Sequence, residues 1–374
     1  EPDGTGFLYA STRRLQGRKL FVWGNGRGSR NWQRKLVSEG LPDYLEIQGG
    51  LAKTQLECLP MPPRTAWEWL EAYGPFQMND SKAAFGEWSR ACEAVAGQVD
   101  AILPEPWLDA ELLRTRGTFA KRPGRLVSAG SGWGALEELR RGAKFCAHLD
   151  FGQPQEEQRP WRELFQTGSL PDVPPDSYVV QPEWDRLLQA ARVQTWQTWL
   201  HRGLYAFHQG NLALAERRFR KSAKLCKTAW NLFALANCAR LHGERRKTIR
   251  LMAQAMRLPE ADLSLAKECL RVLMEKDVAP AMMLELLDAQ PAEHQKRPIF
   301  RFFRAWALAG AGRLDEAEEL VCADGGLEVP DIREGEASIT DLYISIRKKQ
   351  AAREGKTLED QAIEVPGRLD LRMS

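Results

Sequence analysis

The strongest constraint on the fold is a helical pattern that recurs between residues 196 and 331. The stretch WLHRGLYAFHQGNLALAERRFRKSAKL places small and apolar residues at helical spacing on both sides of Gly210, which is typical of two antiparallel helices joined by a tight turn. The pattern returns in NLFALANCARLHGERRKTIRLMAQAMRL, where Gly243 follows Gly210 by 33 residues, and again in FFRAWALAGAGRLDEAEEL around Gly312. A period of this length indicates stacked helix pairs, in which each pair covers the apolar face of the next.

The spacing leaves room for four such pairs. The 69 residues between the second and third of these glycines hold LAKECLRVLMEKDVAPAMMLELLDAQP, which has helical spacing of its own. In the first pair, Gly203 is expected where the two helices touch, and Ala215 and Phe219 are expected to pack the second helix on the first. The pattern resembles tetratricopeptide (TPR) repeats. We therefore expect an α-solenoid of about four TPR-like repeats, with a groove for a protein or peptide partner.

Residues 1–75 have the pattern of a β domain instead. Short strand patterns separated by Gly, Pro and Asn occur at Gly6–Thr12, Lys19–Trp23, Tyr44–Gln48, Leu51–Leu59 and Ala66–Tyr73. Strands this short and this few do not bury both faces of a large sandwich. Because the chain opens at Glu1, almost directly in strand-like sequence, we expect the C-terminal part of a larger, N-terminally truncated β domain.

Between the β part and the repeats, residues 76–195 predict a mixed helical connector, with a helix over Ser81–Val99. Its large aromatic residues are expected to be buried, and they are Trp107, Trp133, Trp161 and Trp184. After the repeats, residues 332–374 predict one charged helix and a tail. The apolar residues of that tail are expected to dock on the helices or on the β part, and they are Val365, Leu369, Leu371 and Met373.

Composition excludes several classes of protein. The chain is 43% hydrophobic and 28% charged with a net charge of +3, and no apolar run approaches the roughly 18 residues of a membrane span. The seven cysteines are scattered and form no C-x-x-C pair. We therefore expect a cytoplasmic protein with reduced thiols, without a membrane segment, a metal site or a cofactor.

One stretch is strongly basic. Between Arg13 and Ser38 the chain has eight basic residues and no acidic one, with Phe21, Trp23 and Trp32 interspersed. Basic and aromatic side chains together suit single-stranded nucleic acid. The sequence favours the alternative, a solvated surface that pairs with acidic residues elsewhere, and nucleic acid is not the expected partner.

The stretch DYLEIQGGLAKTQLECLP, residues 43–60, predicts a hairpin that turns at Gly49 and Gly50. In that register Glu46 lies opposite Lys53, and Glu46, Gln48 and Glu57 share a polar face, whereas Leu45 and Ile47 face the core. Two interpretations of Glu46 remain open here. It is a solvated strand residue, or it is a carboxylate held in a cleft for chemistry.

A later stretch adds aromatic residues to this picture. In AWEWLEAY, strand alternation places Trp67, Trp69, Glu71 and Tyr73 on one face. Indole rings stack on the apolar face of a pyranose, and a carboxylate accepts hydrogen bonds from its hydroxyl groups. This row is therefore either a sugar-binding platform or ordinary core packing.

Five motifs carry a family resemblance over nearly the whole chain, and they are YLEIQ, LAKTQLECLPMP, WEWLEAYGP, GSGWGALE and LDLRM. They resemble a bacterial domain family of unknown function that precedes TPR repeats, and whose β part is similar to the galactose-mutarotase-like supersandwich. Leu45-Glu46-Ile47-Gln48 is similar to the strand that carries the catalytic base of aldose epimerases. The resemblance implies that Glu46 is the catalytic or sugar-contacting carboxylate. The polar face and the aromatic row described above then supply the expected substrate contacts, which are Gln48, Glu57, Trp67, Trp69 and Glu71.

The same resemblance raises a difficulty for catalysis. Opening an aldose ring needs a base and an acid, and in aldose epimerases the acid is a histidine on an earlier strand. The five histidines of this chain all lie outside the β part, at His148, His201, His208, His242 and His294. This sequence therefore does not supply that acid on its own sheet.

Together these patterns predict an α+β multidomain protein: the end of a β-supersandwich, a mixed connector and an α-solenoid of TPR-like helix pairs. The expected function is a carbohydrate-binding or carbohydrate-processing β domain joined to a protein-interaction solenoid, and whether it is an enzyme is left open. The alternative is a non-enzymatic TPR scaffold whose β part is a structural cap.

Overall fold

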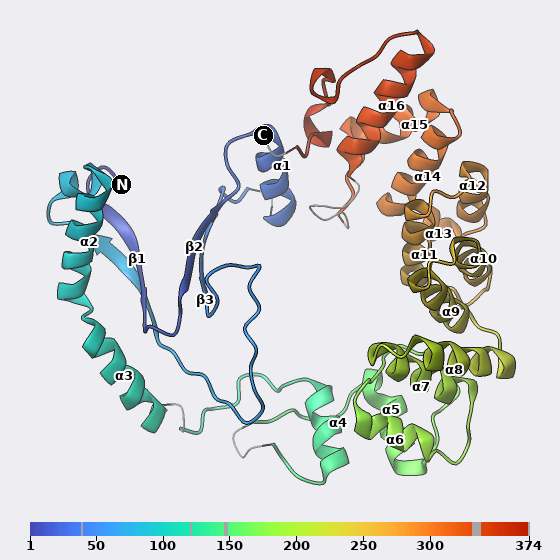
Figure 1. Cartoon of the computed structure of the whole chain (residues 1–374), viewed down its shortest axis with the longest axis horizontal. Coiled ribbons are helices and arrows are strands. Elements are labelled where there is room, and N and C mark those ends of the chain that lie inside the picture. Colours follow the sequence, from blue (N-terminus) through green and yellow to red (C-terminus); the bar gives the residue numbers. More distant parts are fainter. Residues whose placement is uncertain (39, 120–121, 146–148, 331–337, 373–374) are drawn as a thin grey trace. The chain divides into compact units, whose positions relative to one another are not determined.

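The computed structural model describes the chain except for residues 39, 120–121, 146–148, 331–337 and 373–374. It has mixed α+β architecture and is mostly helical, with two small antiparallel sheets among the described residues (Figure 1). The chain forms two compact units. The first contains Glu1–Asn25 and Trp32–Arg125, and the second contains Gly26–Asn31 and Leu126–Ser374.

The strands of the first unit form two separate antiparallel pairs. They are β1 (Thr5–Ser11), β2 (Gly17–Val22), β3 (Leu45–Gly50) and β4 (Glu71–Gln77). β1 pairs with β4, and β2 pairs with β3 (Figure 1). In the first pair Tyr9 lies opposite Tyr73, and their rings stack with centroids 4.8 Å apart. A cross-strand aromatic pair of this kind stabilises a sheet by about 0.2–1 kcal/mol.

Three of the expected strands are confirmed to within two residues at each end, namely β1, β2 and β3. The fourth is displaced, because β4 begins at Glu71 and continues through Gly74 and Pro75, where we expected the sheet to end. Proline is tolerated at that position because β4 has a strand partner on one side and an open edge on the other.

The expected hairpin at Gly49 and Gly50 is wrong. Residues 51–59 form bends and a turn rather than a strand, and β3 pairs with β2, so that Glu46 lies opposite Phe21 instead of Lys53. The pairing ends where Gly50 meets Gly17, the first residue of β2. The backbone of Ala52 passes so close to Gly17 that a Cβ there would clash with it. Beyond this point β2 has no residues left to extend the ladder.

The expected orientation of β3 is also wrong. Leu45 and Ile47, placed on the core side by the sequence pattern, are 54% and 37% exposed. They lie opposite Val22 and Leu20 in the sheet, and these two side chains are exposed as well. Pairing with β2 thus gathers four apolar side chains on one face, which no element in the described part of the chain buries.

The helical segments of the first unit follow the strands. They are α1 (Arg27–Leu36), which the unit shares with the second one, η1 (Ser81–Phe85), α2 (Trp88–Ile102) and α3 (Glu105–Gly117). The single helix expected over Ser81–Val99 is divided at Gly86. Asp80 caps η1 by accepting a hydrogen bond from the Lys82 N–H at 3.0 Å, whereas Glu87 caps α2. Two successive capping residues therefore start two short helices instead of one.

The second unit begins with a small helical core. Its elements are α4 (Gly132–Arg141), η3 (Glu156–Gln158), α5 (Arg159–Thr167) and α6 (Pro182–Gln189). Trp161 and Trp184 are buried in this core as expected, and their rings meet edge to face at 5.8 Å. Trp133 is partly buried against the same cluster, but Trp107, in the first unit, is 51% exposed, so the expectation of burial is wrong for that residue.

A series of helix pairs follows. Their helices are α7 (Trp196–His208), α8 (Leu212–Leu225), α9 (Ala229–Leu241), α10 (Arg245–Met256), α11 (Leu263–Glu275), α12 (Pro280–Asp288), α13 (Ala292–Gln295), α14 (Pro298–Gly310) and α15 (Leu314–Cys322). The pairs α7–α8, α9–α10 and α14–α15 pack closely, and α12 packs mainly on α14 (Figure 1). Successive pairs also contact each other, through α8 and α9 and through α10 and α11.

The expected packing of the first pair is confirmed. A Cβ at Gly203 would clash with the ring of Phe219, so the glycine lets α7 and α8 approach each other, and Phe219 and Ala215 are fully buried. The turns between paired helices repeat as well, because Gly210, Gly243 and Gly312 have φ values of +73°, +73° and +77°. Only glycine adopts this left-handed conformation without strain.

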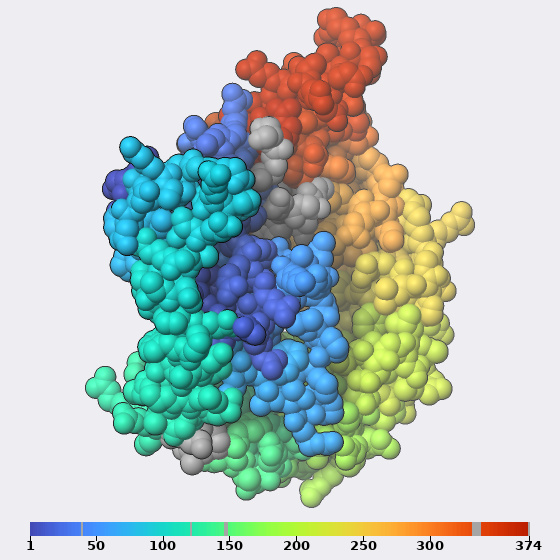
Figure 2. Space-filling model, turned by 60° about the vertical axis from the view of Figure 1, so that its left-hand side comes forward, coloured from blue at the N-terminus to red at the C-terminus, as the bar shows by residue number. Residues whose placement is uncertain are grey.

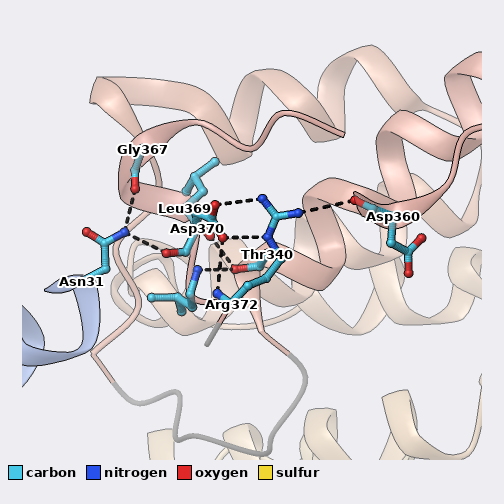
Figure 3. A network of polar contacts seen from close by, with 8 residues as sticks. Asn31, Thr340, Asp360, Gly367, Leu369, Asp370 and Arg372 are labelled. Carbon is cyan, nitrogen blue, oxygen red and sulfur yellow. Dashed lines mark hydrogen bonds and ion pairs between the residues drawn. The ribbon is translucent and has the colours of Figure 1, made fainter. Parts of the chain in front are cut away.

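The chain ends with α16 (Ile339–Arg353), two short 3-10 turns, η5 (Asp360–Ala362) and η6 (Gly367–Leu369), and an extended tail. Leu369 and Leu371 are buried against α16, where Thr340 Oγ1 donates a hydrogen bond to the Leu369 carbonyl and accepts one from the Leu371 N–H at 2.9 Å (Figure 3). Val365 is buried too. The expected docking is confirmed for these three residues, and Met373 lies outside the described residues.

The tail also contacts the beginning of α1. Asn31 Nδ2 donates hydrogen bonds to the carbonyl oxygens of Gly367 and Asp370, at 2.6 and 2.8 Å (Figure 3). Gly28 lies against the backbone of Arg372, where a Cβ would clash. The second unit therefore includes a piece of chain that lies between β2 and β3 in the sequence.

Candidate functional site

Three aromatic side chains of the first unit meet around one carboxylate. Glu71, at the start of β4, accepts hydrogen bonds from the Trp69 indole at 2.7 Å and from the hydroxyl groups of Tyr9, at 3.2 Å, and Tyr73. Trp69 is 38% and Tyr73 56% exposed. Strand pairing explains the arrangement, because Tyr9 on β1 lies opposite Tyr73 on β4, one step along the same face from Glu71.

The electrostatics of this cluster favour an ionised Glu71. Hydrogen bonds from Tyr73 and then from Trp69 and Tyr9 lower the pKa of Glu71, because donors stabilise the carboxylate. The hydrogen bond to the same carboxylate raises the pKa of Tyr73 to about 12. An ionised phenol would have no proton to donate to this carboxylate and would lie beside a like charge. At neutral pH the cluster is therefore a carboxylate held by neutral donors, with two aromatic rings open to solvent.

Two cavities share Trp67 in their lining. The larger cavity, of about 660 Å³, is lined by residues of the segment after β1, of the segment after β3 and of the approach to β4: Arg13, Arg14, Gln16, Leu51, Ala52, Lys53, Glu57, Leu59 and Trp67. The smaller cavity, of about 380 Å³, is lined by Trp67, Glu68, Trp69, Leu112, Thr115 and Arg116. Both volumes fall within the usual range for small-molecule sites. In the space-filling view, the dark-blue N-terminal residues lie recessed between the teal helices α2 and α3 and the lighter blue segment that follows β3 (Figure 2).

Trp67 and Trp69 are here called the tryptophan wall. The backbone next to them is held by the residue that follows β1. Buried Thr12 donates its N–H to the Leu70 carbonyl at 3.0 Å, and its hydroxyl accepts the Leu70 N–H at 3.1 Å. Both indoles line the smaller cavity, and Trp67 lines the larger one as well. The close approach of Ala52 to Gly17 fixes the opposite side of the larger cavity.

Three of the six charged side chains that line the two cavities form ion pairs within the described part of the chain. Arg13 forms a two-point ion pair with Glu105 of α3, with one contact at 2.9 Å. Arg116 of α3 pairs with Glu68, which lies between the two tryptophans. These pairs join α3 to the segments that line the cavities. Arg14 differs, because its guanidinium lies over the indole of Trp67, 5.8 Å from the ring centroid.

The site residues expected from the sequence fall into three groups. Glu57 and Trp67 line the larger cavity, and Trp69 lines the smaller one. Glu71 lies in the tyrosine–tryptophan cluster, which Trp69 joins through its indole N–H.

Glu46 and Gln48 form the third group, on the other sheet. The Gln48 amide donates to Glu46 Oε2 at 2.7 Å, and both side chains are half-buried. Neither lines the two cavities described above. The sequence motif therefore marks a carboxylate that lies outside the two cavities lined by Trp67 and Trp69.

Sequence reasoning missed Tyr9 and the position of Arg14. The signal for Tyr9 was present, since Phe7 and Tyr9 alternate along β1, but it could be used only with the β1–β4 register known. Arg14 belongs to the basic stretch that we set apart as a solvated surface. Its contact with Trp67 joins residues 53 positions apart, which no local pattern predicts.

Other kinds of site were sought in the described part of the chain. No three histidine, cysteine or acidic residues there come together as ligands for a metal ion. None of the helices that the structure describes is both long and apolar enough to traverse a bilayer. Comparison with known proteins found no matching family model, no matching curated protein and no matching solved structure.

Proposed function

We propose that the first unit binds carbohydrate at the tryptophan wall. The observation that carries this proposal is the smaller cavity, in which Trp67 and Trp69 lie beside the paired charges of Glu68 and Arg116. Indole faces contribute apolar stacking area for a sugar ring, and paired charged groups provide acceptors and donors for its hydroxyl groups. Trp67 lines the larger cavity too, so the wall has room for more than one sugar ring.

The proposed activity is binding rather than turnover. Glycosyl and epimerase chemistry needs an acid and a base that both reach the sugar. Glu71 is occupied by three donors, and Glu46 hydrogen-bonds Gln48 on the other sheet. The epimerase-like motif suggests a role for Glu46 instead, and the variant Glu46→Gln distinguishes the two sites. Sugar binding should be unchanged in this variant if the wall is the site.

Binding of neutral oligosaccharides to the full chain tests the proposal. Titration calorimetry with cellobiose, maltose, chitobiose and longer members of each series should show saturable binding to at least one of them. Trp69→Ala should weaken that binding at least tenfold, whereas Trp107→Ala, which removes an exposed tryptophan of α3 outside both cavities, should not. Absence of binding throughout the series, or equal loss in the two variants, would contradict the proposal.

We further propose that the two sheets belong to a β-sandwich of the galactose-mutarotase-like type. Support comes from the exposed apolar face formed by Leu20, Val22, Leu45 and Ile47, which a second sheet packed on it would bury. Dye binding offers a check. Leu20→Lys together with Ile47→Lys should reduce anilinonaphthalene sulfonate fluorescence of the full chain, and an unchanged signal would argue against an open apolar face.

A second candidate function, peptide binding by TPR-like helix pairs, is favoured by a cavity of about 170 Å³ in the helix stack. Its lining includes Met274, Met283, Trp306 and Leu342, with Lys349 beside them. Lys349 Nζ donates to the Ala309 carbonyl at 3.1 Å. This chemistry suits an apolar side chain next to a carboxylate.

Peptide selection on the full chain tests this candidate. Selected peptides should pair an acidic residue with a large apolar one and lose at least tenfold in affinity with Trp306→Ala, but not with Trp69→Ala. Peptides that bind both variants equally would count against this cavity.

A further inference from the structure

Three arginines line the two cavities, and they differ in how their charge is balanced. Arg13 is paired with Glu105, and Arg116 is paired with Glu68. Arg14 has neither an ion pair nor a hydrogen bond to any part of the chain that the structure describes. Of the three guanidinium groups, Arg14 is therefore the one whose charge and donors are left for a ligand.

Arg14 is also held in a favourable position for binding an anion. Its guanidinium lies over the Trp67 ring at 5.8 Å from the centroid. A guanidinium in a cation–π contact keeps its five N–H groups, which lie in its own plane, and these match the two oxygen atoms of a carboxylate or phosphate. Contact with an indole also limits the rotamers of the long side chain, which reduces the entropy lost when a ligand binds.

The rest of the larger cavity adds positive charge. Lys53 and Glu57 both line it, and Glu57 accepts the backbone N–H of Lys53 at 3.2 Å rather than pairing with its ammonium group. With Arg13 balanced by Glu105, the cations Arg14 and Lys53 face the one carboxylate of Glu57. The larger cavity is therefore net positive beside an aromatic ring that it shares with the smaller cavity.

We propose that the carbohydrate recognised here is acidic: a saccharide that carries a carboxylate or a phosphate, which Arg14 binds while a sugar ring lies against the tryptophan wall. This inference rests on the proposed function, since it assigns the ligand class of the same site. It extends that function because it predicts discrimination by charge, which stacking alone does not provide.

Matched pairs of ligands test the charge preference on the full chain. Cellobiose is compared with cellobiouronic acid, and glucose with glucose 6-phosphate, by titration calorimetry at low and at physiological salt. Inorganic phosphate and acetate are titrated alone. The acidic member of at least one pair should bind tenfold or more tightly than its neutral partner, and raising the salt concentration should reduce that ratio.

Variants then identify the residue responsible. Arg14→Gln should bring the ratio of acidic to neutral affinity close to one, and Arg14→Lys should restore part of it, because an ammonium keeps the charge without the planar fork. Arg34→Gln is the matched control. It removes the same charge from an exposed position of α1 that lines neither cavity, and it should leave the ratio unchanged. Melting curves check that all variants remain folded.

The outcomes separate the two proposals. If no saccharide binds, the proposed function itself fails. If neutral and acidic saccharides bind equally well, or if Arg34→Gln lowers the ratio as much as Arg14→Gln, carbohydrate binding stands and the charge preference is overturned. If inorganic phosphate or acetate binds as tightly as the acidic saccharide, the cavity recognises an anion without its sugar, which also overturns the inference.

Discussion

His201 should make the second unit lose stability as the solution becomes mildly acidic. It lies on α7, its side chain is buried, and its ring meets Trp161 edge to face with the centroids 4.6 Å apart. Nδ1 has no hydrogen-bond partner among the described residues. Burial lowers the pKa of His201 from 6.5 to about 4, because the imidazolium would be charged in an apolar environment.

The sign and size of the effect follow from linkage. Below pH 6.5 the unfolded chain binds a proton at His201 that the folded chain does not bind until the pH approaches 4. The free energy of unfolding therefore falls as the pH is lowered through this window. At 1.36 kcal/mol per pKa unit, the loss from this residue is about 2 kcal/mol by pH 5 and about 3 kcal/mol by pH 4.

Urea denaturation followed by circular dichroism at 222 nm measures this loss, at pH 7.5 and at pH 5. His201→Leu and His201→Gln should lower stability at pH 7.5 by amounts set by their packing, yet lose about 2 kcal/mol less than the wild type between the two pH values. His208→Gln is the control, because His208 is exposed on the same helix. Equal losses in the wild type and both His201 variants would refute the reasoning.

Three further predictions concern packing, the tail and the carboxylate cluster. Gly203→Ala should destabilise the chain by about 1–2 kcal/mol in urea titrations, because its Cβ would clash with a buried ring of α8. Gly97→Ala, in an open position of α2, should instead stabilise the chain by about 0.5–1 kcal/mol. A stability change of the same sign in both variants would contradict this account. Thr340→Val should cost about 1–3 kcal/mol for each of the two buried backbone groups that lose their partner, and faster tryptic cleavage after Arg368 would report release of the tail, while unchanged cleavage would argue against that anchoring role. Glu71→Gln should lower the pKa of Tyr73 from about 12 toward 10, as read from its absorbance at 295 nm; an unshifted titration would show that the carboxylate does not control the phenol.

The helix pairs were predictable because each depends on local information. A glycine with positive φ recurs in the turn of three pairs. In the first pair, the helices pack through Gly203, Ala215 and Phe219, which all belong to that pair. The turn between the paired helices recurs with the same backbone conformation in three pairs, so a pattern over some 30 residues is enough to locate each of them. Nothing from a distant part of the chain is needed to place these residues.

The strands were harder, because a strand pattern does not name its partner. The stretch around Glu46 fitted a tight hairpin, and two glycines supplied an acceptable turn, yet β3 pairs with β2 across a helix. A wrong strand partner for β3 also gives Glu46 a wrong cross-strand neighbour and assigns Leu45 to the wrong face. The same limitation hid Tyr9 from the candidate site and left the contact between Arg14 and Trp67 unforeseen.

The contact between Asn31 and the C-terminal tail has a consequence for the order of events during synthesis. Asn31 hydrogen-bonds the carbonyl oxygens of Gly367 and Asp370, so this contact joins residues that are 336 and 339 positions apart. Asn31 is made before its partners, and it must wait until residues 367–370 have left the ribosome. The helix pairs need no such wait, since their contacts are local. We therefore expect native packing around Asn31 to form after the helix pairs, and an isolated piece beginning at residue 126 or 196 to lack it.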